Sequence, residues 1–236
     1  MLKINHYTKR FGDKIAVNDL SLHIRQGEIY GFIGHNGAGK TTTLKACCGL
    51  LQPDEGDILI RDISIVKNPL EAKKHLAYIP DNPDLYEFMT GIRFLSFVAD
   101  IYHVSREDRE ARVARYGELL GLKEELAQPV AEYSHGMKQK LAIMAALLHE
   151  PELIVMDEPF VGLDPIASHQ LKTLMRQMCD EGAAIFFSTH VLETAEKLCD
   201  KVAVIRNGQL VVSGTMDEVR GNESLEEVFL GIEGRR

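Results

Sequence analysis

The fold of this chain can be approached from one glycine-rich segment, Gly34-His35-Asn36-Gly37-Ala38-Gly39-Lys40-Thr41-Thr42. It follows a short apolar run over 29–33 and precedes a helix-like segment over 41–49. The pattern matches G-x-x-x-x-G-K-[ST], the loop that wraps nucleotide phosphates between a strand and a helix. Glycines let several backbone N–H groups turn toward one anion, and the helix N-terminus adds its positive dipole end. The motif therefore predicts a phosphate-binding loop in a P-loop NTPase core.

Two side chains of this loop have individual roles in the prediction. Lys40 would reach the β- and γ-phosphates, and the Thr41 hydroxyl would bind Mg²⁺. A glycine-rich turn that matches by chance is the alternative, and the strand before it and the helix after it argue against a chance match. The nucleotide-binding residues expected here are Gly34, His35, Asn36, Gly37, Ala38, Gly39, Lys40, Thr41 and Thr42.

Composition limits the classes of protein to which the chain belongs. Its 236 residues, 45% hydrophobic and 26% charged, are ordinary for a soluble globular protein with a sizeable core. The net charge of −8 argues against broad binding to nucleic acid, so no nucleic-acid partner is expected. The apolar run 141–148 is too short to cross a bilayer, and the N-terminus lacks a signal-peptide pattern. The expected location is the cytosol, or a membrane surface to which a partner holds the chain.

The cysteines give no sign of a metal or redox site. Cys47, Cys48, Cys179 and Cys199 lack C-x-x-C spacing. Cys47 and Cys48 follow the phosphate loop on the predicted helix, where we expect one or both to pack in the core.

Short apolar runs alternate with helical patterns along the chain. Strands are predicted within 2–24 with a turn at Gly12-Asp13, and at 57–65, 76–79, 153–156, 183–187 and 202–205. The segment 86–150 is almost wholly helical, a long helix begins near Pro165, Asn207-Gly208 predicts a hairpin, and Thr215 to Glu218 has capping-box spacing. This order predicts an α/β fold: a mostly parallel sheet covered on both faces, an N-terminal antiparallel β subdomain and an inserted α-helical subdomain.

Two further strand ends carry polar side chains. The run 153–156 is followed by Asp157 and Glu158, and the run 183–187 by Ser188-Thr189-His190. In P-loop ATPases an acid at the first of these ends holds Mg²⁺, which is the role predicted for Asp157. Glu158 would accept a proton from the attacking water, and a neutral His190 would bridge water and γ-phosphate. Surface acids that merely end a strand, and a histidine without function, are the alternatives.

Together these motifs resemble those of one family, the ATP-binding cassette (ABC) ATPases, the nucleotide-binding subunits of ABC transporters. The segment Tyr-Ser-His-Gly-Met-Lys-Gln-Lys over 133–140 stands where the family has its L-S-G-G-Q signature, and Gly162-Leu163-Asp164 resembles its D-loop. The resemblance implies that Asp157-Glu158 are metal acid and base, and that His190 is the switch histidine. It also implies that Phe11 stacks on adenine, with a core-facing Phe11 as the alternative.

Two departures from the family pattern matter. His135 replaces the first signature glycine and Met137 the glutamine, while Ser134 and Gly136 are kept, so we expect the phosphate contact to survive. Asp81 stands where the family usually has a glutamine at the catalytic site. An ionised aspartate is shorter and only accepts hydrogen bonds, so Asp81 is expected to meet Mg²⁺ through water. Some export-type (ABC-2-like) bacterial branches carry an acid here, and the resemblance favours that branch.

The resemblance also implies an architecture. It predicts one ABC nucleotide-binding domain over 1–236, with an ATP-binding core of 1–84 and 151–236 and a helical signature subdomain of 85–150. Two copies, or this chain and a homologous ATPase, would pair head to tail. ATP with Mg²⁺ would then lie between the phosphate loop of one subunit and Ser134, His135 and Gly136 of the other, with Asp164 nearby. The helix that begins at 136 offers backbone N–H groups to the γ-phosphate.

The implied function is ATP hydrolysis that powers transport by separate membrane-spanning permease subunits, at the cytoplasmic face of the cell membrane. These subunits would dock on 84–102, where Tyr86 and Phe88 are candidates for contact and Phe94 and Phe97 are expected to pack inside. The transported substrate cannot be read from this chain. A soluble relative that acts in DNA repair, translation or iron–sulfur assembly is the alternative. A P-loop kinase or GTPase is disfavoured by Glu158, His190 and the signature.

Overall fold

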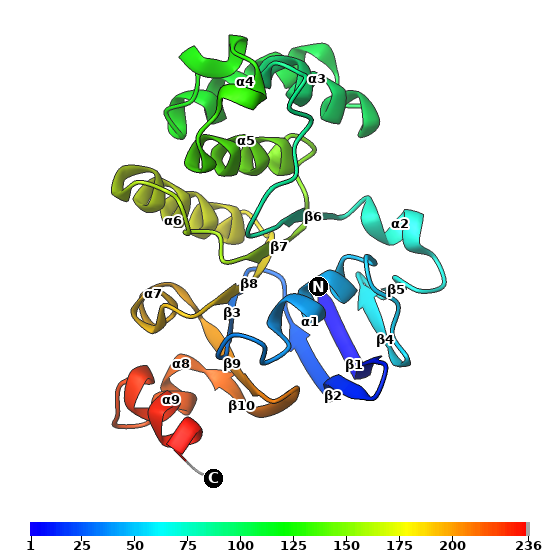
Figure 1. Ribbon diagram of the computed structural model, residues 1–236, viewed down its shortest axis with the longest axis vertical. Helices are drawn as coiled ribbons and strands as arrows, with labels where there is room; N and C mark the ends of the chain where they lie inside the picture. Colours follow the sequence, from blue (N-terminus) through cyan, green and yellow to red (C-terminus); the bar gives the residue numbers. More distant parts are fainter. Residues whose placement is uncertain (235–236) are drawn as a thin grey trace.

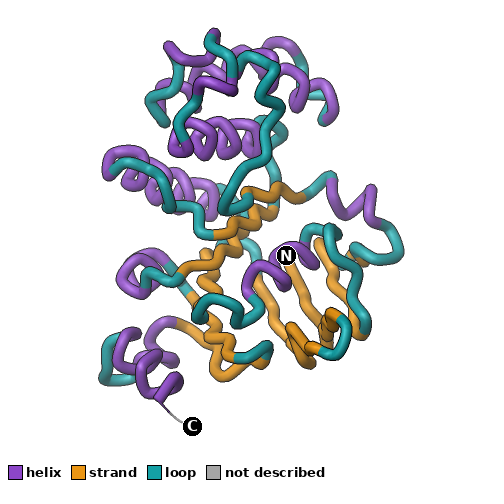
Figure 2. The backbone as a smooth tube through the Cα atoms, in the orientation of Figure 1, coloured by secondary structure: helices purple, strands orange, loops and turns teal. Residues whose placement is uncertain are grey.

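Two β-sheets and a separate group of helices make up residues 1–234, the part of the chain that the computed structural model describes (Figure 1). The phosphate loop lies between the sheets, and the helices of 91–147 lie at the end of the molecule farthest from the C-terminus (Figures 1 and 2).

The smaller sheet is antiparallel and has the strand order β2-β1-β4-β5. Its strands are β1 (Leu2–Phe11), β2 (Lys14–Ile24), β4 (Glu55–Ile60) and β5 (Ile63–Ser64). Leu2 and Ile4 lie opposite Ile24 and Leu22, and these four side chains are buried against the phosphate-loop helix. This sheet is the N-terminal antiparallel part that the alternating pattern predicted.

The larger sheet has the strand order β10-β9-β3-β8-β7-β6, and its first five strands in the chain run parallel to one another. β10 pairs antiparallel with β9 through the hairpin predicted at Asn207-Gly208. The strands are β3 (Ile29–Ile33), β6 (Leu76–Ile79), β7 (Leu153–Asp157), β8 (Ala184–Thr189), β9 (Lys201–Arg206) and β10 (Gln209–Thr215). The carboxyl ends of β3, β7 and β8 therefore meet at one edge.

Both faces of the larger sheet are covered, because its central strands are apolar on both sides. Phe32 and Phe186 face the core shared with the smaller sheet and α1 (Lys40–Cys47). Ile33 and Phe187 face the opposite core, which includes residues of α6 (Pro165–Asp180) and α7 (Leu192–Leu198).

The inserted helices follow one another with clear caps. Thr90, Ser105 and Ser134 cap α3 (Gly91–Ile101), α4 (Arg106–Leu119) and α5 (His135–Leu147) by accepting a backbone N–H. Two 3₁₀ turns, Glu124–Ala127 and Val130–Glu132, join α4 to α5. Elsewhere the chain forms α2 (Pro69–Lys73), α8 (Met216–Arg220) and α9 (Leu225–Gly234), and the capping box predicted at Thr215 and Glu218 begins α8.

The aromatic residues of the helical insert differ from the prediction at one position. Phe94 is buried as expected, whereas Phe97 is 38% exposed, so its predicted place inside the insert is wrong. The Phe97 ring on α3 meets the Tyr86 ring edge-on, at 5.6 Å between centroids. Phe97 thus joins the exposed pair Tyr86 and Phe88 on one surface.

The predicted packing of Cys47 and Cys48 in the core is confirmed, and Cys179 and Cys199 are buried free thiols as well. Within residues 1–234 no helix is both long and apolar enough to cross a membrane.

Candidate functional site

The phosphate loop leaves β3 and enters α1 through a backbone that requires glycine at two positions. Gly39 caps α1 with φ 112°, and a β-carbon there would lie 2.8 Å from the carbonyl oxygen of Ala16. A β-carbon on Gly34 would lie 2.6 Å from the carbonyl oxygen of Ile205. The neighbouring strands β2 and β9 thus approach the loop too closely for a side chain at either position, so only glycine fits there.

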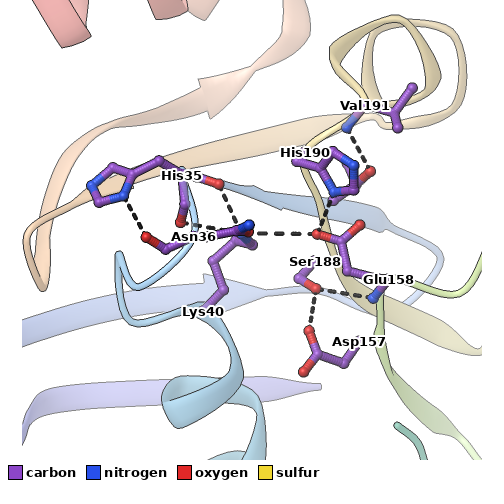
Figure 3. A network of polar contacts seen from close by, with 10 residues as sticks. His35, Asn36, Lys40, Asp157, Glu158, Ser188, His190 and Val191 are labelled. Carbon is purple, nitrogen blue, oxygen red and sulfur yellow. Dashed lines mark hydrogen bonds and ion pairs between the residues drawn. The ribbon is translucent and has the colours of Figure 1, made fainter. Parts of the chain in front are cut away.

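Lys40 points into this loop from the first turn of α1 (Figure 3). Its ammonium donates to the carbonyl oxygens of Gly34 and His35 at 2.7 and 3.3 Å, and only 7% of the residue is exposed. Burial lowers the pKa of Lys40, while Glu158 and Asp157 oppose that shift. A buried cation with two neutral carbonyls as its closest partners is well suited to bind a phosphate.

Asp157 ends β7 and is held by Ser188, its neighbour on β8 (Figure 3). The Ser188 hydroxyl donates to Asp157 Oδ1 at 2.5 Å and accepts the backbone N–H of Glu158 at 3.1 Å. The carboxylate is 1% exposed, and its second oxygen, Oδ2, has no hydrogen-bond partner among residues 1–234. A buried carboxylate oxygen without a partner is costly unless a cation or water occupies the adjacent space.

Glu158 lies between Lys40 and His190 (Figure 3). Its Oε1 is 3.8 Å from Lys40 Nζ and 3.0 Å from His190 Nδ1. The residue has φ 48°, a conformation uncommon outside glycine, which turns the side chain out of the strand direction. The His190 side chain is 57% exposed, so it can reach a ligand from the solvent side.

A cavity of about 320 Å³ joins these parts. It is lined by Phe11, Lys14, Ala16, Asn36, Gly37, Gly39, Lys40, Thr41, Thr42, Asp81, Asp157 and Glu158. Gly34, His35 and Ala38 belong to the same loop without lining the cavity, and His190 meets it through Glu158. The cavity therefore brings together the loop, the acids and Phe11, as the sequence predicted.

Two residues that line the cavity, Lys14 and Ala16, were missed in the sequence. They lie on β2, outside any motif, and reach the cavity because β2 pairs with β1 beside Phe11. Ser188 was noted only as a polar residue at the end of an apolar strand, and its bond to Asp157 was not predicted. Phe11 itself is 50% exposed, so the alternative of a core-facing Phe11 is wrong.

Asp81 lines the cavity after β6, at its exposed rim. Its Oδ1 accepts the backbone N–H of Asn82 at 2.9 Å, a local bond that holds the carboxylate at the end of the strand.

The signature residues do not line the cavity that residues 1–234 form. Ser134 is exposed at the start of α5 and caps it by accepting the Met137 N–H. Asp164 caps α6 and is paired with Lys140 at 2.8 Å. The hydrogen bond from Lys140 lowers the pKa of Asp164 most, and the capping N–H of Ala167 lowers it further. In Figure 1 the start of α5 belongs to the helical part of the molecule, away from the phosphate loop.

The cavity fits a hard cation only in part. Thr41, Asp81 and Asp157 supply the oxygen donors that Mg²⁺ prefers, and Asp157 Oδ2 is a buried oxygen without a partner among the described residues. Residues 1–234 contain no group of three or more His, Cys, Asp or Glu that could hold a metal by themselves. Such a sparse donor set is typical of Mg²⁺ sites that phosphate oxygens complete.

Comparison with known proteins agrees with this geometry. Residues 17–161 match the family model described as "ABC transporter". The chain is 34% identical over 233 residues to the ABC transporter ATP-binding protein NatA of Bacillus subtilis, covering 97% of this chain and 95% of that protein. It is 33% identical over 219 residues to the uncharacterized ABC transporter ATP-binding protein sll0415 of Synechocystis, covering 91% of this chain and 61% of that protein.

The fold has close counterparts as well. A solved structure titled "Structure of ATP binding subunit of ABC transporter" superposes with a TM-score of 0.95 at 35% identity, covering 99% of each chain. This chain spans about three fifths of the length of the Synechocystis relative. The family match covers more than half of the chain, and the fold and the phosphate loop agree with it. The chain therefore belongs to the ABC transporter family.

Proposed function

We propose that this chain is the ATP-binding and ATP-hydrolysing subunit that powers transport by separate membrane-spanning permease subunits. The observation that supports this most is the meeting of Lys40 with Asp157 and Glu158 at one cavity, from two segments far apart in the sequence. Each supplies a different requirement of phosphoryl transfer: a cation for the phosphates, an acid for the metal and a carboxylate for the water.

In this proposal ATP is the substrate and its phosphates lie in the loop. Lys40 leaves the carbonyl oxygens of Gly34 and His35 and turns to the β- and γ-phosphates, because a phosphate is the stronger acceptor. Phe11 offers an exposed ring to the same cavity, where adenine would stack. The loop residues between them would donate backbone N–H groups.

Thr41 and Asp157 would hold Mg²⁺, with Asp81 meeting it through water. The ion would supply charge neutralisation of the phosphates. Glu158 would accept the proton of the attacking water, and its contacts with Lys40 and the 57% exposed His190 hold the carboxylate beside the cavity. His190 would then stand beside the γ-phosphate as a hydrogen-bonding group.

The remaining predicted residues fit a site shared between two subunits. Ser134, His135 and Gly136 begin α5 outside the cavity, and backbone N–H groups at a helix N-terminus are suited to bind a phosphate. A second copy, or a homologous ATPase, would place these residues over the γ-phosphate in a head-to-tail dimer, with Asp164 beside the interface. ATP binding would complete the dimer and hydrolysis would release it.

The permease subunits would hold the chain at the cytoplasmic face of the cell membrane. Their docking surface would include Tyr86, Phe88 and Phe97, which are 48, 81 and 38% exposed, with the Tyr86 ring in contact with each of the other two. Clustered exposed aromatics are typical of protein interfaces. We further propose that the chain divides into a core of 1–84 and 151–236 and a helical part of 85–150. The helical part is inserted between β6 and β7 of the core.

An export-type transporter suits the acid at position 81 and the names of two relatives. One is the probable multidrug ABC transporter ATP-binding protein YbhF of Escherichia coli, 32% identical over 96% of this chain and 39% of that protein. The other is the linearmycin resistance ATP-binding protein LnrL of Bacillus subtilis, 33% identical over 93% of this chain and 70% of that protein.

The test combines turnover with affinity capture. The purified chain should release phosphate from ATP in a Mg²⁺-dependent manner, and capture of the native protein should recover an integral membrane protein from the membrane fraction. A chain that releases no phosphate contradicts the enzymatic part of the proposal. Recovery with ribosomes or DNA instead, with no membrane protein, would support the soluble ABC-type ATPase and contradict the transporter.

A further inference from the structure

The first turn of α5 and the loop over 158–164 are in unusually close contact. A β-carbon built on Gly162 would lie 2.4 Å from Cδ2 and 3.0 Å from Nε2 of His135. A β-carbon built on Gly136 would lie 2.4 Å from the carbonyl oxygen of Gly162. The His135 ring therefore occupies the space that any side chain at position 162 would need, and Gly162 has φ 80°.

A third residue of α5 contacts the same loop. Lys140 pairs with Asp164 at 2.8 Å, at the end of the loop. Positions 136 and 140 are one helical turn apart and lie on one face of α5 next to position 135, so these contacts form one continuous surface.

The other end of the loop is Glu158. Its backbone N–H donates to Ser188, its φ is 48°, and its carboxylate meets His190. Inside the loop the N–H of Val161 donates to the Glu158 carbonyl oxygen at 3.1 Å, and the N–H of Leu163 donates to the Phe160 carbonyl oxygen at 3.3 Å. A segment of seven residues thus joins the Glu158 carboxylate to the first turn of α5.

We infer that His135 is a positioning residue: by packing on Gly162 it fixes the loop over 158–164 and hence the Glu158 carboxylate. The inference rests on the proposed function for the role of Glu158, but the contact itself does not. His135 and Gly162 form a matched pair, because the ring replaces the missing side chain at 162. A displacement of the first turn of α5 would be passed through this pair to Glu158.

The first test is amide hydrogen exchange in the nucleotide-free protein. His135→Ala removes the ring while favouring the helix, so helix fraying cannot explain a loss of protection. We expect exchange at Val161 and Leu163 to be roughly three- to tenfold faster, because the loop loses the packing of the His135 ring on Gly162. His135→Phe keeps a ring and should restore protection, and the Ala38 amide in the phosphate loop should not change in either variant.

Steady-state kinetics separates positioning from a merely structural role. His135→Ala should lower kcat, and His135→Phe should recover it, because Phe keeps a ring against Gly162 but cannot hydrogen-bond a phosphate across a subunit interface. Wild-type exchange rates in His135→Ala, or a His135→Phe variant that behaves like His135→Ala, would overturn the inference. A wild-type chain without turnover would contradict the proposed function and leave the exchange result intact.

A double-mutant cycle tests the matched pair directly. Gly162→Ala should lower thermal stability more in the wild-type background than in His135→Ala, because the clash exists only when the ring is present. Gly121→Ala is the matched control: Gly121 has φ 59°, and no atom lies within 4 Å of its β-carbon position. Its cost should be the same in both backgrounds. Equal costs of Gly162→Ala in the two backgrounds would contradict the pairing.

Discussion

Ser188→Ala is the substitution whose cost the structure defines best. Ser188 is fully buried on β8, where its hydroxyl donates to Asp157 Oδ1 at 2.5 Å and accepts the Glu158 N–H at 3.1 Å. The substitution removes one oxygen and opens no large cavity. It leaves a carboxylate oxygen and a backbone N–H that both lose their partner.

The expected magnitude follows from those two bonds. A hydrogen bond to a charged group contributes about 1.5–3 kcal/mol, and an unsatisfied buried donor costs about 1–3 kcal/mol. The two effects share one site and are not additive, so we expect the free energy of unfolding to fall by roughly 3 kcal/mol. For a chain of this length that corresponds to a decrease in Tm of about 6–12 °C. Asp157 should also bind Mg²⁺ less well, because it is no longer oriented.

The assay is denaturant unfolding together with a Mg²⁺ titration of ATP hydrolysis. Thr43→Val is the matched control: Thr43 is fully buried, and its hydroxyl donates to the Gly39 carbonyl at 2.9 Å. That carbonyl still accepts the Thr43 N–H at 3.0 Å, so Thr43→Val leaves no group unpaired and should cost less than about 1 kcal/mol. Equal losses of stability in the two variants would show that Ser188 is not the partner on which Asp157 and the Glu158 N–H depend.

Two further substitutions test individual roles. Lys40→Ala should weaken ATP binding by at least tenfold, about 1.4 kcal/mol or more, because a buried charge-assisted phosphate contact is lost. The measurement is equilibrium binding of a fluorescent nucleotide, and an unchanged affinity would exclude Lys40 from the phosphate site. Asp81→Gln should retain or raise the rate of phosphate release, because an amide both donates and accepts hydrogen bonds at the exposed rim of the cavity. Complete loss of turnover would show that the aspartate is essential.

Local patterns made much of the site predictable. The phosphate loop, Asp157 and His190 each follow an apolar strand, and parallel neighbouring strands bring such ends to one edge. The capping box at Thr215 and the hairpin at Asn207-Gly208 depend only on adjacent residues, and both predictions are confirmed.

What the sequence did not reveal depends on contacts between distant segments. Lys14 reaches the cavity through the pairing of β1 with β2, and no pattern within β2 marks it. The spacing of Phe97 from other apolar residues predicts a buried helix position, yet its ring is partly exposed and packs on Tyr86. The close fit of His135 on Gly162 joins two motifs that lie 27 positions apart and is visible only in three dimensions.

In the proposed dimer each nucleotide site is completed by the first turn of α5 of a second subunit. Mixing two inactive variants, Lys40→Ala and Ser134→Arg, tests whether the site is shared in this way. A shared site predicts recovery of Mg²⁺-dependent ATP hydrolysis, because the mixed dimer contains one site with both an intact phosphate loop and an intact Ser134. A mixture of Lys40→Ala with Glu158→Gln is the control, since neither of its sites is intact, and it should stay inactive. If the first mixture is no more active than its components, the site is not shared between subunits.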